Sequence, residues 1–127
     1  ICQPIWDEQH LLLAAIDGMG GYEGGEVAAQ IARDTILQYL TERPNGERLQ
    51  LLKEAVCEAN NQIHKARVGN LSEMGCVAST ALVEYDKGIV NLVHVGTKAG
   101  YDLELTRAIS EVVSVPVCYR PARKDLA

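Results

Sequence analysis

One short stretch of the sequence combines a carboxylate with a high density of glycine. Asp17 follows the apolar run 11–16, and five glycines lie between Asp17 and Glu26. Because glycine has no side chain, the backbone at such a position can approach a ligand closely. The Asp17 carboxylate and the Gly18 backbone carbonyl are oxygen ligands of the kind that Mg²⁺ or Mn²⁺ prefers. The stretch is a candidate metal-binding loop, and the alternative is a glycine-rich turn that Asp17 merely caps.

The histidines and cysteines indicate no second site. Their spacing matches neither a zinc-binding HExxH helix nor a CxxC pair. We therefore expect structural or surface roles for these side chains, and the sparse, scattered cysteines suit a reducing compartment. The residues concerned are His10, His64, His94, Cys2, Cys57, Cys76 and Cys118.

Composition and net charge argue against a nucleic acid or membrane partner. The 127 residues carry a formal net charge of -5, which disfavours a nucleic acid partner because phosphate backbones select basic surfaces. The longest apolar run, residues 11–16, is far shorter than the roughly 20 residues that span a bilayer. No basic-then-apolar signal region opens the sequence. We expect a cytoplasmic protein of one domain, with no nucleic acid and no membrane partner.

The elements that would position Asp17 can be read from hydrophobic periodicity. The run 11–16 is typical of a buried strand that ends at Asp17, and helical spacing from Glu26 to the break at residues 44–46 predicts a first helix. Residues 47–67 repeat that spacing and predict a second helix. The β-branched runs 77–85 and 89–95, separated by a turn at 86–88, predict a hairpin. The fold class is therefore α+β, with two helices packed on a sheet. A third helix is predicted over 102–113 and a short strand over 114–118.

Several segments together resemble the metal-dependent serine/threonine protein phosphatases of type 2C, over about residues 7–96. The resemblance implies that the chain forms part of that family's β-sandwich and that the intact family is a hydrolase acting on phosphoserine and phosphothreonine in proteins. It also implies that Asp17 bridges two divalent cations, Mg²⁺ or Mn²⁺, that Gly18 offers its carbonyl to one of them, and that a metal-bound water attacks phosphorus. The matching segments are residues 13–28, 52–55, 58–60, 74–83 and 93–96.

The departures from that family pattern predict an incomplete site. The pattern includes an Asn-Glu-Asp-like segment on the preceding strand and two further aspartates in a second half, and none can be placed here. Asp7 and Glu8 lie too close to Asp17 to be the upstream segment, so we expect them on the surface. Where the family has Asp-Ser-Arg, the chain has Thr97-Lys98-Ala99. We expect a fragment, because the chain begins at Ile1 without Met. The alternative is a non-catalytic module that associates with itself or another chain through exposed strand edges.

The last thirty residues have a different character. Residues 96–117 resemble a loop, helix and strand of the cyclase subunit of imidazole glycerol phosphate synthase, a (β/α)₈ barrel. The resemblance implies that Gly96 helps to hold a phosphate and that two units, 1–96 and 97–127, meet at a junction, as in a chimera. A phosphate-sugar site would need at least one more phosphate loop, and the sequence contains none.

Overall fold

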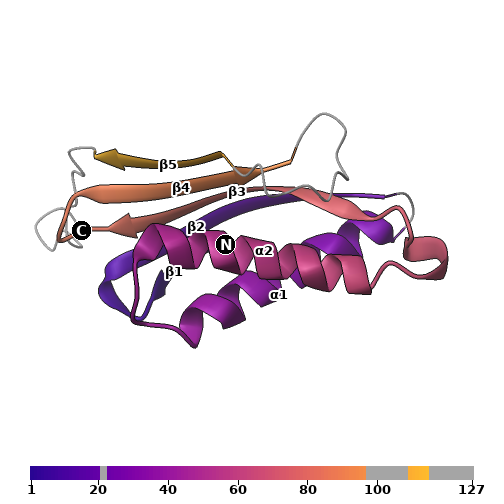
Figure 1. Cartoon of the computed structure of the whole chain (residues 1–127), viewed down its shortest axis with the longest axis horizontal. Helices are drawn as coiled ribbons and strands as arrows, with labels where there is room; N and C mark the ends of the chain where they lie inside the picture. Colours follow the sequence, from indigo (N-terminus) through magenta and orange to yellow (C-terminus); the bar gives the residue numbers. More distant parts are fainter. Residues whose placement is uncertain (21–22, 97–108, 115–127) are drawn as a thin grey trace, which may run out of the picture.

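The computed structural model describes residues 1–20 and 23–96 in full and the backbone of residues 109–114. It contains one five-stranded sheet with the order β1-β2-β3-β4-β5, and two helices lie side by side along the sheet (Figure 1). Each strand pairs antiparallel with its neighbour in sequence. This α+β arrangement confirms the fold class that the sequence predicts.

The strands follow the predicted hairpin and extend beyond the predicted first strand. The bounds are Cys2–Ile5 for β1, Asp7–Met19 for β2, Gly75–Glu84 for β3, Ile89–Val95 for β4 and Ile109–Ser114 for β5. The apolar run at 11–16 is the middle of β2, whose polar ends carry no hydrophobic signal. β1 was not predicted, since it is short and contains Pro4, which is poorly suited to a strand interior.

Both predicted helices are confirmed. α1 spans Gly24–Thr41 and α2 spans Arg48–Lys65, and a short 3₁₀ helix, η1, spans Gly69–Leu71. α1 packs over β2 and β3, whereas α2 packs over β3, β4 and the edge of β5. The core lies between the helices and the sheet, because these amphipathic helices bury one stripe each. Its largest fully buried side chains include Leu12, Ile36, Leu40, Leu52, Leu82 and Val93.

The helix predicted over 102–113 is wrong for the part that the structure describes. Residues 109–114 form β5, which pairs antiparallel with β4 from Ile109↔His94 to Ser114↔Ile89. Ile109, Val112 and Val113 are β-branched and favour a strand, and pairing satisfies the backbone groups along the edge of β4. The strand was predicted over 114–118; Ser114 is the last residue of β5, and residues 102–108 and 115–118 lie outside the described residues. Because the barrel resemblance required a helix here, the likeness to the cyclase subunit is not supported.

Candidate metal-binding loop

Asp17 and Gly18 lie near the end of β2, where the chain turns toward α1. In the β2–β3 pair, Asp17 stands opposite Val77 and Gly18 opposite Cys76. The Asp17 side chain is exposed, whereas Gly18 is half-buried. Since successive strand residues point to opposite faces, the carboxylate is available to solvent while Gly18 packs against the helix layer.

The glycines on either side of the turn bring two backbones into direct contact. A Cβ placed on Gly18 would lie 1.8 Å from the Gly25 carbonyl oxygen, and a Cβ on Gly25 would lie 2.8 Å from the Gly18 carbonyl oxygen. No side chain can fit between them. The sequence suggested close approach to a ligand, and in the structure the same freedom lets the end of β2 touch the first turn of α1.

Met74 fixes the glycine loop from the other side. Gly20 has φ +136°, and a Cβ there would lie 2.5 Å from the Met74 Cα. Met74 is fully buried, and its carbonyl accepts a hydrogen bond of 2.7 Å from Arg67 Nε. The segment 74–76, which the sequence singled out only by resemblance, therefore anchors the loop that carries Asp17.

Cys76 is the titratable neighbour of Asp17. Burial, and to a lesser extent the negative charge of Asp17, raise the pKa of the Cys76 thiol from 9.0 to about 11. Cys76 is therefore a neutral thiol at neutral pH. A nucleophile would have to be the thiolate, so Cys76 is not activated as a nucleophile in this loop.

The residues that the structure describes do not by themselves fit a two-metal centre. They contain no group of three or more His, Cys, Asp or Glu residues placed to hold a metal ion. Asp17 and the Gly18 carbonyl supply oxygen from one strand, whereas such centres draw several oxygen ligands from different elements. Asp7 and Glu8 do not help, because they begin β2 and Asp17 is near its end.

Gly96 lies at the same end of the sheet as Asp17. Its φ of +124° and the side chain of Val77, 2.8 Å from where a Cβ would be, both require glycine. Val77 in turn stands opposite Asp17. The expected phosphate contact at Gly96 came from the cyclase resemblance, which is not supported. Backbone conformation and packing account for this glycine without a ligand.

A buried polar cluster at the opposite end of the sheet was missed by sequence reasoning. Glu84 is 4% exposed and accepts a hydrogen bond of 3.1 Å from Asn91 Nδ2. Three further nitrogen atoms lie near its other oxygen: Lys87 Nζ at 3.7 Å, Arg48 Nε at 3.9 Å and His10 Nε2 at 4.0 Å. These partners come from separate elements, so no local motif could have revealed the cluster.

The sequence is similar to known protein phosphatases. Residues 2–99 match the family model described as protein phosphatase 2C. The serine/threonine protein phosphatase PstP of Mycobacterium tuberculosis strain H37Rv is 36% identical over 102 residues, which cover 76% of this chain and 19% of PstP. The chain thus spans about a fifth of the length of that relative.

The fold is also similar to the solved structures of several phosphatases. A crystal structure of M. tuberculosis PstP/Ppp has a TM-score of 0.59 at 28% identity, covering 75% of this chain and 43% of that one. The PstP catalytic domain in complex with two manganese ions has a TM-score of 0.59 at 27% identity, with coverages of 76% and 46%. A bacterial serine phosphatase has a TM-score of 0.74 at 19% identity, with coverages of 92% and 64%, and supports the fold alone. No helix in the described part of the chain is long and apolar enough to cross a membrane.

Proposed function

Because the chain belongs to the protein phosphatase 2C family, we propose that it forms part of a domain that hydrolyses phosphoserine and phosphothreonine in proteins, and that it needs further residues to complete the site. The observation that carries this proposal is the family match over residues 2–99 together with the exposed Asp17 carboxylate at the junction of β2 and α1. Substrates would be phosphorylated proteins.

Asp17 and the Gly18 carbonyl would contribute to a centre for Mg²⁺ or Mn²⁺, the cofactor class of the manganese-bound PstP domain. Divalent ions at such centres activate water and neutralise charge on a phosphoryl group. Because one carboxylate and one carbonyl cannot hold two ions, we infer that the isolated chain has little or no activity. The missing carboxylates would come from another segment or another chain.

The register of β1 indicates where a carboxylate could be added. Ile1 and Ala14 exchange two backbone hydrogen bonds, with N–O distances of 2.8 and 2.9 Å. On this side of β2, residues 15–19 have no partner strand within the described part of the chain. A strand that continued the β1 register would place the position three residues before Ile1 opposite Asp17. Opposite residues of an antiparallel pair share a face, so an acidic side chain there would lie beside Asp17.

The test compares the 127-residue chain with a chimera in which it replaces the matching part of the PstP catalytic domain. We expect Mn²⁺-dependent hydrolysis of a phosphothreonine peptide by the chimera and none by the isolated chain. Asp17→Ala should lower the turnover of the chimera by at least about 100-fold, whereas Glu8→Gln should leave it unchanged. A folded chimera that binds Mn²⁺ but has no activity would contradict the phosphatase proposal.

The open edge of β2 favours a second candidate, a non-catalytic module that associates by strand pairing. Unpaired strand edges recruit other strands, and Ala15 is exposed on this segment. Association should then appear in sedimentation velocity, and Ala15→Lys should abolish it, because a charged side chain at an edge opposes pairing. A chain that stays monomeric at high concentration would rule this candidate out.

A further inference from the structure

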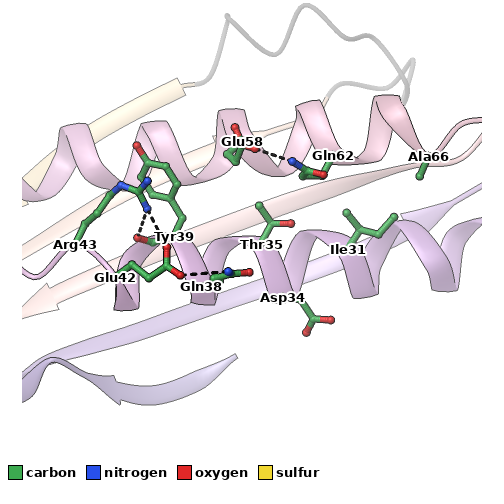
Figure 2. Close-up of a pocket in the computed structure, with 10 residues that line it drawn as sticks. All are labelled: Ile31, Asp34, Thr35, Gln38, Tyr39, Glu42, Arg43, Glu58, Gln62 and Ala66. Carbon is green, nitrogen blue, oxygen red and sulfur yellow. Dashed lines mark hydrogen bonds and ion pairs between the residues drawn. The ribbon is translucent and has the colours of Figure 1, made fainter.

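A groove runs between α1 and α2 on the outer side of the helix layer, as Figure 2 shows. Its volume is about 680 Å³. Ile31, Thr35 and Tyr39 of α1 and Glu58 and Gln62 of α2 line it. We call this feature the α1–α2 groove. It is separate from the Asp17 loop, because the helices lie between it and the sheet.

The carboxylates of the groove are oriented by neutral donors. Gln62 Nε2 donates to Glu58 at 2.7 Å, and Gln38 Nε2 donates to Glu42 at 3.2 Å. Glu54, which does not itself line the groove, accepts a hydrogen bond of 2.8 Å from the hydroxyl of the lining residue Tyr39. A neutral donor holds a carboxylate in place without cancelling its charge. These carboxylates are therefore held in place to accept further hydrogen bonds.

Glu58, which lines the groove, and Glu54, one helical turn before it, are not held in ion pairs in the described part of the chain. Within the described residues, neither Glu54 nor Glu58 forms an ion pair within 4 Å. The hydrogen bond from Gln62 holds the pKa of Glu58 below its usual value, so Glu58 is ionised at neutral pH. Like charges four residues apart on a helix destabilise it. Glu54 and Glu58 thus form a negative pair on one helix face. The positive charges of Lys65 and Arg43 act on Glu58 without forming an ion pair with it.

One part of the groove already holds a guanidinium group. Arg43 lies over the Tyr39 ring with its Cζ 3.7 Å from the ring centroid. Its Nη1 donates to the Tyr39 carbonyl at 3.1 Å and lies 3.7 Å from Glu42, as the dashed lines in Figure 2 indicate. An aromatic face bordered by carboxylates is a good environment for arginine. Arg43 demonstrates that this groove accommodates such a group.

We propose that the α1–α2 groove binds a segment of a partner protein that carries arginine or lysine. Charge complementarity decides the occupant: Glu58 in the groove and Glu54 beside it can accept further, charge-assisted hydrogen bonds from a cationic side chain. A guanidinium on the ligand would compete with Arg43 for the Tyr39 ring. An acidic or phosphorylated segment would be repelled. The proposal does not depend on metal binding or hydrolysis.

The probe is a short fluorescent peptide with several arginines, compared with the same peptide carrying glutamine at those positions. Anisotropy with the full chain should show binding of the arginine peptide that weakens as ionic strength rises. Glu58→Gln and Glu54→Gln keep their acceptor oxygens, and each should weaken binding about threefold, with about tenfold for the double variant. Glu8→Gln, which changes net charge equally but lies on β2, should leave binding unchanged. Urea unfolding establishes that each variant is folded.

Replacing Arg43 gives a second test, in which peptide binding should tighten and not weaken. Arg43→Gln removes the resident guanidinium from the Tyr39 ring and should tighten peptide binding by about threefold. Arg33→Gln, a matched loss of one positive charge on α1, should change it much less. Equal effects of the two variants would mean that only net charge matters, and the groove would not be the site.

Other results would also overturn the proposal. Binding that survives the Glu54→Gln, Glu58→Gln double variant, or no binding by the wild type, would exclude the groove. Tighter peptide binding after Arg120, Arg123 and Lys124 are replaced by glutamine would identify the chain's own basic segment as the occupant. A concentration-dependent dimer that the double variant dissociates would identify a second copy.

Discussion

Gly18 and Gly25 join β2 to α1 by backbone contact, so the loop that carries Asp17 depends on the absence of two side chains. The contact is steric and does not involve φ at Gly18. A methyl group at Gly18 would lie 1.8 Å from the Gly25 carbonyl oxygen, and rigid backbone atoms on both sides cannot move aside cheaply. Replacing either glycine should therefore displace the start of α1.

We expect Gly18→Ala to lower the free energy of unfolding by about 3 kcal/mol, because overpacking against backbone forces both elements to shift. Urea unfolding followed by circular dichroism measures the loss. Gly69→Ala is the matched control, because Gly69 has φ +58° and a Cβ there would meet no atom within 4 Å. The only penalty is the left-handed backbone conformation, so the free energy of unfolding should fall by about 1 kcal/mol. Equal losses at the two positions would contradict the proposed backbone contact.

The effect of the Asp17 charge on Cys76 can be tested through the thiol. The Cys76 pKa is about 11, raised first by burial and then by the Asp17 charge. Asp17→Asn removes that charge and should lower the pKa of Cys76, so alkylation by iodoacetamide should rise at a lower pH than in the wild type. Mass spectrometry follows the reaction, with the exposed Cys2 and Cys57 as internal references. An unchanged pH profile would mean that the Asp17 charge does not act on the Cys76 thiol.

The raised pKa of Cys76 also makes the stability of the fold depend on pH. Because the folded pKa lies above 9.0, folding favours the neutral thiol. The contribution of Cys76 to stability is therefore complete below pH 9 and is lost as pH rises toward about 11. The direction follows from linkage between proton binding and folding.

At the scale of elements, α2 begins with a side-chain cap and α1 does not. Glu47 accepts hydrogen bonds from the Leu49 and Gln50 backbone N–H groups, at 3.2 and 2.7 Å, whereas Glu23 before α1 makes no such bond. Glu47→Ala should lower the free energy of unfolding by about 1 kcal/mol, because two N–H groups lose their acceptor. Glu23→Ala should have almost no effect in the same urea titration. A larger effect at Glu23 would contradict the assigned caps.

The elements differ in how far the sequence could predict them. Both helices and the β3–β4 hairpin were predictable because their apolar residues repeat with the right period and a turn separates the strands. β5 was missed because Leu103, Ile109 and Val113 have helical spacing, while its strand conformation is stabilised by pairing with β4. Tertiary pairing overrides local preference in such segments.

The site was predictable only in part, for a related reason. Asp17 and Gly18 could be selected because a strand end and a run of glycines are local features. The packing of Met74 against Gly20, and of Gly18 against Gly25, joins residues that are distant in sequence or separated by a turn. Sequence periodicity carries no information about such contacts.

At the scale of the whole molecule, the described residues form one layered unit, with Asp17 at one end of the sheet and the Glu84 cluster at the other. The helices cover one face of the sheet. The side chains of Leu11, Leu13 and Ala81 alternate with buried neighbours and are only half-buried, and Leu92 is 36% exposed. These residues form the inner surface of a sandwich if a second sheet packs on them. A chain that spans less than half of the solved PstP structures is consistent with one layer of such a sandwich.

Glu84 should stabilise the whole unit, because its partners lie on β2, α2, β4 and the β3–β4 turn. Glu84→Gln keeps an acceptor for Asn91 but removes the charged partner that lies 3.9 Å from the partly buried Arg48. Breaking a buried pair in this way should lower the free energy of unfolding by about 3 kcal/mol. Lys87, whose side chain is 62% exposed, is the control, since Lys87→Met should cost less than about 1 kcal/mol. Urea unfolding followed by both tryptophan fluorescence and circular dichroism should give coincident transitions for each variant. Separate transitions, or equal losses for the two variants, would show that Glu84 does not couple the helices to the sheet.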